Sequence, residues 1–342
     1  MGVMIRVPFD ELTRRIESVL LGLGLTPPRA VLGARLIAET DRDGVRTHGV
    51  ARLPRLAEGI RLGYISPTAE PERVASLGAM ERWAGHRGVG NLAAHAAMTR
   101  AIELAAEYGI GAVALGNTSH WMRGGAFGWL AAEQGFAAMC WSNTLPNLPP
   151  WGATTPALGN NPLILAVPHV DESGQQAPIV LDIAMSQFSY GSLSSYRQRG
   201  VPLPVPGGYD EHGELTTDAG AIEESKRALP IGFWKGSGLA FVLDTMGAML
   251  SGGKATWQFG ADPLQEVGQS QIFLAMKADE AGAREMIQGA IDKVHDATPV
   301  TEGKPARYPG EGTIAVRAES LREGCAIEDA AWEAFLKLEA GA

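Results

Sequence analysis

The chain is poor in cysteine, has no long hydrophobic run and has fewer basic than acidic residues. Neither of its two cysteines, Cys140 and Cys325, has the spacing of a zinc site or a redox pair. No apolar run is long enough to span a bilayer, and the N-terminus lacks the hydrophobic core of a signal peptide. We therefore expect a cytoplasmic protein with reduced thiols and no metal site.

The charge balance argues against a nucleic-acid partner. The chain has 29 Lys and Arg against 38 Asp and Glu, which gives a formal net charge of −9. A protein that binds a phosphate backbone needs a basic surface, which this composition does not provide. An anionic ligand would have to be bound by a few arginines or lysines placed locally.

Two glycine-rich stretches lack the context of the dinucleotide fingerprint. Residues 109–114 and 88–93 both fit G-x-G-x-x-A. The fingerprint requires a strand, a glycine turn and then a helix. The first stretch runs from a predicted helix into a strand. The second opens a helix, but its candidate acid, Glu107, falls inside that helix. The sequence therefore argues against a conventional Rossmann domain.

The remaining pattern predicts an α/β protein. The length of 342 residues suggests about two domains of roughly 150 residues each. Hydrophobic periodicity predicts helices at 8–22, 29–40, 49–62, 91–108, 126–133, 238–250, 280–294, 318–324 and 327–338. Short apolar runs predict strands at 112–115, 136–141, 163–167, 179–183 and 271–276. We expect 187–218 to be a long functional loop and 238–250 to be buried on most faces.

His48 and Arg52 form the richest chemical pattern. Thr47 is a plausible N-cap of the predicted helix 49–62, and a spacing of four residues would place His48 and Arg52 one turn apart on one face. An imidazolium can protonate a developing alkoxide while a guanidinium binds a neighbouring carboxylate. A capping turn with a solvated arginine explains the same residues, so spacing alone leaves both interpretations open.

Three further segments offer ligand-binding groups. Residues 117–125 follow a predicted strand and contain His120 and Arg123, although an ordinary loop is an alternative. Asp182 is the single acid of an apolar strand and must be hydrogen-bonded, to a cofactor hydroxyl, to His48 or to backbone. Trp234 and Lys235 precede a helix and suit a nicotinamide or a pyrophosphate, but they are a weak signal alone.

Taken in order, these segments resemble the malate/L-lactate dehydrogenase family that lacks a Rossmann fold. The resemblance covers nearly the whole chain. Its landmarks are residues 44–55, 76–79, 88–92, 117–125, 150–153, 161–164, 188–191, 234–238 and 270–273. The block 120–125, His-Trp-Met-Arg-Gly-Gly, is the most specific of these segments to one branch of the family.

The resemblance implies a three-layer fold with a mixed sheet, and a homodimer. Residues 76–279 would form the sheet domain that binds the cofactor, and 1–75 with 280–342 a helical domain on the substrate side. The cofactor would be NADH, with NADPH possible. Ile183 and Ala184 stand where the pattern is expected to include Ser or Thr, so the preference between NADH and NADPH stays open.

The resemblance also assigns site residues. By position, His48 matches the proton donor, and Arg52 matches a substrate-side arginine that His120 and Arg123 would assist. The positions that match cofactor contacts are Pro178, Ile179, Val180, Leu181, Asp182, Ile183, Ala184, Trp234, Lys235, Gly310, Glu311 and Gly312.

The activity that follows is reduction of the ketone of a 2-oxo acid to a 2-hydroxy acid. Trp121 and Arg123, after His120, favour a longer polyhydroxylated acid. Malate, lactate, ureidoglycolate and cyclic imino acids are rival substrates within the family. A non-catalytic sugar-acid binding protein is the alternative from another class, since it would need the pocket but neither His48 nor the cofactor segments.

Overall fold

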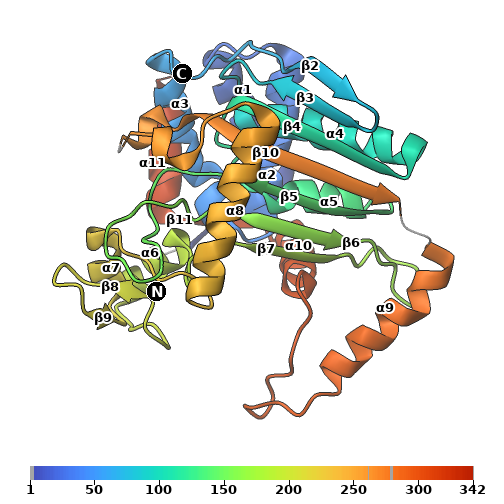
Figure 1. Cartoon of the computed structure of the whole chain (residues 1–342), viewed down its shortest axis with the longest axis vertical. Coiled ribbons are helices and arrows are strands. Elements are labelled where there is room, and N and C mark those ends of the chain that lie inside the picture. The colour runs from blue at the N-terminus through green and yellow to red at the C-terminus, as the bar shows by residue number, and fades with distance from the viewer. Residues whose placement is uncertain (1–3, 261, 278–279, 342) are drawn as a thin grey trace.

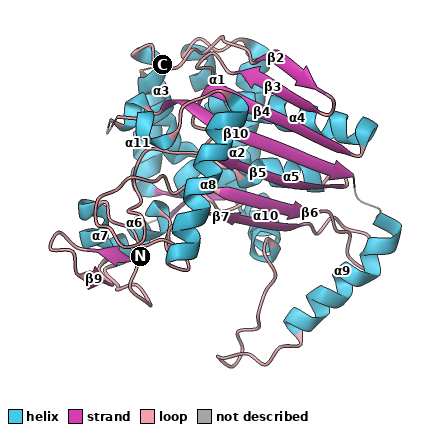
Figure 2. Ribbon diagram, in the orientation of Figure 1, coloured by secondary structure: helices cyan, strands magenta, loops and turns pink. Residues whose placement is uncertain are grey.

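The fold is known from a computed structural model that describes residues 4–260, 262–277 and 280–341. The strands of its main sheet are β2 (Glu72–Leu77), β3 (Met80–Ala84), β4 (Ile110–Ser119), β5 (Phe136–Ser142), β6 (Leu163–Val167), β7 (Ile179–Ile183) and β10 (Val267–Lys277). Within the described residues these seven strands follow the order β2-β3-β4-β10-β5-β6-β7 (Figures 1 and 2). Of the strand pairs described in this sheet, β3 and β4 alone run parallel. The sheet is therefore mixed, unlike the parallel sheet of a Rossmann domain.

Helices cover both faces of this sheet, which gives three layers. Helices α4 (Gly90–Tyr108) and α5 (Gly125–Ala132) pack on one face, and α8 (Trp234–Ser251) on the other. Successive side chains of β10 point to opposite faces of the sheet. Phe273 packs in the core between the sheet and α4, and Ile272 packs in the core between the sheet and α8. A strand that is buried on both faces has a continuous apolar sequence, and this pattern predicted β10 at residues 271–276. The expected α/β class is confirmed.

The two ends of the chain share a third core. It is built mainly by helices α1 (Phe9–Gly22), α2 (Pro27–Arg42), α3 (Leu53–Arg61) and α11 (Asp329–Ala340), and Leu12 and Ile16 belong to the same cluster as Phe335. Strands β1 (Met4–Val7) and β11 (Cys325–Glu328) pair antiparallel beside it. Figure 1 shows the blue N-terminal helices next to the red α11. Among the described residues no helix is long and apolar enough to cross a membrane.

The predicted helix 49–62 is wrong at its start. Two 3₁₀ turns, Arg46–His48 and Val50–Arg52, precede α3, which begins only at Leu53. Gly49 has a ψ of −127°, which no helix accommodates. Thr47 therefore caps no helix, and His48 and Arg52 are not one α-helical turn apart.

Three other predictions are corrected. The segment 187–218 is not a single loop, because it contains helix α6 (Tyr190–Arg199) and the pair β8 (Gly208–Tyr209) and β9 (Leu215–Thr216) before α7 (Ala219–Ser225). The helix expected at 318–324 is the end of α10 (Glu311–Glu323), and the start of the helix expected at 327–338 is strand β11. Helix α8 is not buried on most faces, since Phe241 is 56% exposed and Met249 72%. Helix α9 (Glu280–His295) projects away from the sheet (Figure 1).

Candidate active site

The turn that carries His48 is held by a buried carboxylate from α2. Oδ2 of Asp41 accepts a hydrogen bond from the Val50 N–H at 2.8 Å, and Asp41 is 1% exposed. A Cβ atom on Gly49 would lie within 2.3 Å of this carboxylate, so only glycine fits there. Burial raises the pKa of Asp41 to about 7, although the hydrogen bond from the Val50 N–H and the positive charge of Arg46 both act to lower it. The end of α2 therefore decides where His48 lies.

His48 is a neutral imidazole in the ligand-free protein at neutral pH. Burial lowers its pKa to about 3, assisted by the positive charges of Arg52 and Arg123. Its Nδ1 lies 2.8 Å from Oγ1 of Thr47, so the hydroxyl holds the ring in orientation. Within the described chain no protein atom hydrogen-bonds Nε2 of His48, and this nitrogen is available to a ligand.

His120 lies beside His48 with a defined tautomer. The two rings are nearly parallel, with centroids 6.1 Å apart. Nδ1 of His120 accepts a hydrogen bond from the Met122 N–H at 3.0 Å, so the neutral ring carries its proton on Nε2. Burial, followed by the charge of Arg52, holds the pKa of His120 well below its usual value. The site thus contains two neutral imidazoles, of which His120 is a hydrogen-bond donor.

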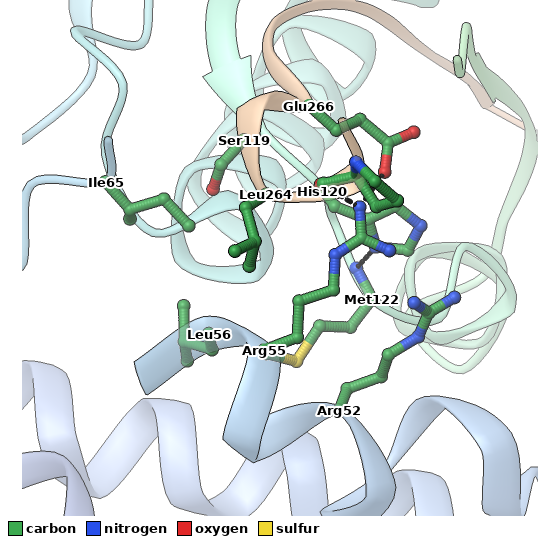
Figure 3. Close-up of a pocket in the computed structure, with 10 residues that line it drawn as sticks. Arg52, Arg55, Leu56, Ile65, Ser119, His120, Met122, Leu264 and Glu266 are labelled. Atoms are coloured by element: carbon green, nitrogen blue, oxygen red, sulfur yellow. Dashed lines mark hydrogen bonds and ion pairs between the residues drawn. The ribbon is translucent and has the colours of Figure 1, made fainter. Parts of the chain in front are cut away.

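A small cavity of about 40 Å³ opens beside His120. Figure 3 shows the guanidinium groups of Arg52 and Arg55 extending from the helical segment toward His120 and Glu266. Nε of Arg52 is buried and has no hydrogen-bond partner among the described residues. A buried donor without a partner is costly, so Arg52 is suited to bind an anionic ligand.

Arg123 binds an aspartate of the protein. Its Nη1 lies 2.7 Å from Oδ2 of Asp43, and both side chains are buried. Asp43 also binds Arg317 of α10 at 2.8 Å and Arg42 at 2.9 Å. Burial alone would raise the pKa of Asp43, but the three arginines outweigh it and hold that pKa well below its usual range. Arg123 therefore joins the loop after β4 to α2 and α10.

Two of the predicted cofactor segments meet at the edge of the sheet. The N–H of Val180 in β7 donates to the carbonyl of Pro309 at 2.9 Å, which places residues 178–184 against the turn 310–312. A Cβ on Gly310 would lie 3.0 Å from the backbone nitrogen of Val180, so the turn approaches the strand as closely as glycine allows. Beside this contact is an open groove of about 590 Å³, lined by Leu181, Arg307, Tyr308, Pro309, Gly310, Gly312 and Thr313.

The other cofactor candidates lie elsewhere. Trp234 and Lys235 open α8 and are exposed, and they do not line the groove beside β7. They follow Ile231, whose N–H donates to the carbonyl of Met185 at 2.8 Å, so they lie beyond the carboxyl end of β7. Oδ2 of Asp182 accepts the backbone N–H of Gly125 at 3.0 Å, which is the backbone alternative considered for this acid.

Sequence reasoning assigned no role to three residues: Asp41, which positions the His48 turn, and Arg55 and Glu266, which pair in the cavity wall. Arg55 follows Arg52 by three residues and could have been noticed from that spacing. Glu266 is 211 residues from Arg55 and lies in no recognisable motif.

Comparisons with known proteins agree with this architecture. The family model for malate/L-lactate dehydrogenase matches residues 7–336. The 2,3-diketo-L-gulonate reductase of Escherichia coli K12 is 42% identical over 332 residues, which cover 96% of this chain and 98% of the relative.

Solved structures extend the likeness to the whole fold. Malate dehydrogenase from Pyrococcus horikoshii OT3 is similar with a TM-score of 0.88 and 25% identity, covering 99% of this chain and 95% of that one. Δ1-Piperideine-2-carboxylate reductase from Pseudomonas syringae pvar. tomato has a TM-score of 0.85 and 26% identity, covering 98% and 99%. From the matched family model and the 42% identical relative, we conclude that this chain belongs to the malate/L-lactate dehydrogenase family of oxidoreductases.

Proposed function

We propose that this enzyme reduces the ketone of a polyhydroxylated 2-oxo acid with NADH, and that 2,3-diketo-L-gulonate is its substrate. The observation that carries the proposal is the placement of His48 beside His120 and within reach of the charge of Arg52, both of which line the cavity, although His48 itself is not among its lining residues. Among the described residues, Nε2 of His48 and the buried Nε of Arg52 have no hydrogen-bond partner. A carboxylate on Arg52 would bring the neighbouring ketone within reach of His48. The 42% identity to a 2,3-diketo-L-gulonate reductase supports this choice of substrate.

The groove beside β7 suits the cofactor. Its volume is within the range of sites that bind small molecules, and Gly310 and Gly312 bring backbone close to whatever it holds. It lies at the N-terminus of the 13-residue helix α10, and Arg307 lines it, a combination that favours the phosphates of a dinucleotide. Residues 178–184 and 310–312 would hold the cofactor, which when bound supplies the hydride. Trp234 and Lys235 would contact it only beyond the end of β7.

The side chains of the chain then have distinct tasks. Arg52 binds the carboxylate of the 2-oxo acid in fork geometry and fixes the ketone. His48 holds the proton on Nε2 and gives it to the ketone oxygen as negative charge develops there. His120 donates from Nε2 to a hydroxyl of the substrate, since its Nδ1 is occupied by the N–H of Met122. Arg123 assists through Asp43 and through its charge near His48.

The depressed pKa of His48 predicts opposite pH profiles for the two directions. Reduction needs the protonated ring, and with a pKa of about 3 the protonated fraction of the free enzyme falls tenfold for each pH unit above it. We expect log kcat/KM for reduction to decline with a slope of −1 between about pH 5 and 8. Oxidation needs the neutral ring, so its kcat/KM should not change through His48. Initial rates in both directions measure this, and a plateau for reduction up to pH 7 would contradict it.

The direct test combines cofactor binding with a substrate panel. We expect NADH to quench tryptophan fluorescence saturably and to be oxidised with 2,3-diketo-L-gulonate faster than with oxaloacetate or pyruvate, as read by nicotinamide absorbance. NADPH in the same titration measures the cofactor preference. Absence of NADH binding would favour the non-catalytic binding protein, and a strong preference for oxaloacetate or pyruvate would favour a malate or lactate dehydrogenase.

We also propose that the enzyme is a homodimer. Helix α8 exposes an apolar row at helical spacing, formed by Leu239, Val242, Met246 and Met249. Contiguous apolar surface of this kind marks an interface in soluble proteins. A Val242→Asp variant is expected to shift the protein from dimer to monomer in sedimentation velocity. Val31→Asp is the matched control, because Val31 is 51% exposed on α2 and Val242 45% on α8. An unchanged mass for Val242→Asp would argue against this interface.

The cellular location and the division into domains are also part of what we propose. We place it in the cytoplasm, which is consistent with its free and buried Cys140 and Cys325. We propose residues 76–279, together with the first residues of strand β2 (Glu72–Leu77), as the cofactor domain, and the rest of residues 1–75 with 280–342 as the helical domain. The shared core of α1, α2, α3 and α11 supports joining the two chain ends.

A further inference from the structure

The cavity beside His120 ends on an ion pair that the proton transfer does not use, formed by the buried Glu266 and the partly exposed Arg55. Nη2 of Arg55 lies 2.6 Å from Oε2 of Glu266. Glu266 is 7% exposed, so it faces the cavity and very little bulk water. The apolar side chains of Leu56, Ile65 and Leu264 form much of the remaining wall (Figure 3). A ligand that fills the cavity must therefore interact with this pair.

The carboxylate of Glu266 is fixed in place and still has accepting capacity. Oε1 accepts the backbone N–H of Leu145 and the side-chain amide of Gln269, each at 3.2 Å. Oε2 accepts from Arg55, and an ionised carboxylate has about four acceptor positions in total. Burial raises the pKa of Glu266, and the charges of Arg55 and Arg52 with the N–H of Leu145 oppose this. Its position is thus set before any ligand arrives.

Arg55 and Glu266 together should bind hydroxylated, alkyl and anionic substrate tails with different affinity. A hydroxyl can donate to Oε2 of Glu266 and accept from the guanidinium of Arg55, so it satisfies both groups. A carboxylate would bring a second negative charge against Glu266 in a poorly solvated place, where like charges repel strongly. An alkyl tail would cover the pair without hydrogen-bonding it. Hydroxylated tails are favoured over alkyl tails, and alkyl tails over anionic ones.

We propose that Arg55 and Glu266 determine substrate specificity, by binding the distal hydroxyls of a sugar-derived 2-oxo acid and rejecting acids with a second carboxylate. This inference rests on the proposed function, because it takes Arg52 as the site of the first carboxylate. The cavity of about 40 Å³ holds about three water molecules, at 10–15 Å³ each, and hydroxyl groups of a substrate tail would replace them.

A set of six-carbon acids that differ only in the tail tests the proposal. 2-Keto-L-gulonate has distal hydroxyls, 2-oxohexanoate an alkyl tail and 2-oxoadipate a second carboxylate. For the wild-type enzyme we expect kcat/KM to fall in that order. In Glu266→Gln, kcat/KM is expected to fall about tenfold for 2-keto-L-gulonate and to rise about tenfold for 2-oxoadipate, with 2-oxohexanoate within about threefold.

Glu81→Gln is the matched control. Glu81 is also buried, at 1% exposed, and is paired with Arg73 at 3.2 Å and Arg100 at 3.0 Å, but on strand β3 and outside the cavity. In Glu81→Gln, kcat/KM for the three acids should follow the same order as in the wild-type enzyme. If Glu266→Gln does not fold, Glu266→Asp keeps the charge and should still reject 2-oxoadipate.

The outcomes separate this inference from the proposed function. If no 2-oxo acid oxidises NADH, the proposed function fails. If NADH is oxidised but Glu266→Gln leaves the ratio of 2-keto-L-gulonate to 2-oxoadipate unchanged, the specificity role of the pair is overturned. A wild-type preference for 2-oxoadipate over 2-oxohexanoate would also overturn it.

Discussion

Replacing His48 with asparagine is expected to lower kcat for 2-oxo acid reduction by about 10²–10⁴-fold, the range for loss of a positioned acid. Asparagine can keep a polar contact with Thr47, whose hydroxyl lies 2.8 Å from the histidine ring, but it cannot hold a transferable proton. The groove beside β7 does not include residue 48, so the dissociation constant for NADH should change by less than about twofold. Single-turnover absorbance at 340 nm (the nicotinamide band) and fluorescence titration measure the two quantities.

The control for this variant is His212→Asn. His212 lies on an exposed turn, with a side chain 77% exposed, and its replacement should leave both quantities unchanged. The pH profile adds a second readout, because the slope of −1 for reduction should disappear in His48→Asn. Turnover close to that of the wild type in His48→Asn would refute its role as proton donor.

Replacing Arg52 with methionine is expected to lower kcat/KM for 2-oxo acids by about 10²–10³-fold, mainly through KM. The guanidinium is the proposed partner of the substrate carboxylate, and removing one partner of a poorly solvated charged pair costs several kcal/mol. Methionine keeps most of the side-chain length, so the cavity wall near Leu56 and Met122 should persist. The expected loss should be small for the methyl ester of the same acid, since the ester presents no charge to Arg52.

A second effect of this variant comes from the pKa of His48. Arg52 is one of the charges that lower that pKa, so Arg52→Met should move the reduction profile toward higher pH. Arg35→Met is the control, because Arg35 is exposed on α2 and pairs with Glu39 at 3.9 Å on the surface. An equal loss for acid and ester would show that Arg52 maintains structure and does not bind the carboxylate.

The sequence was enough to locate strands that form short apolar runs. The apolar runs of β6 and β7 were located to the residue, because a short run of aliphatic residues is a local signature of a strand even where one face is partly exposed. Strands β2 and β3 at the other edge were not predicted. Every residue of β2 is exposed, so it lacks the hydrophobic pattern on which the prediction depends.

The site shows the same division. His48 and Arg52 were noticed because an imidazole and a guanidinium stand close together in a glycine-flanked segment, and the family resemblance, rather than their spacing, assigned their roles. The path of the backbone between them was not, since it depends on Asp41, whose carboxylate occupies the space beside Gly49 and accepts the N–H of Val50. A helix was predicted there because periodicity does not register a contact of that kind.

The sequence alone determined the class of fold, the family and the residue types available for proton transfer, because these depend on local periodicity and short motifs. Only the tertiary structure decided that Arg123 binds Asp43, 80 residues away, and that Arg55 meets Glu266, 211 residues away. Such pairs form when the folded chain brings distant segments together and buries at least one of the two partners, because a buried charge without a partner is costly. No local pattern encodes which distant partner that will be.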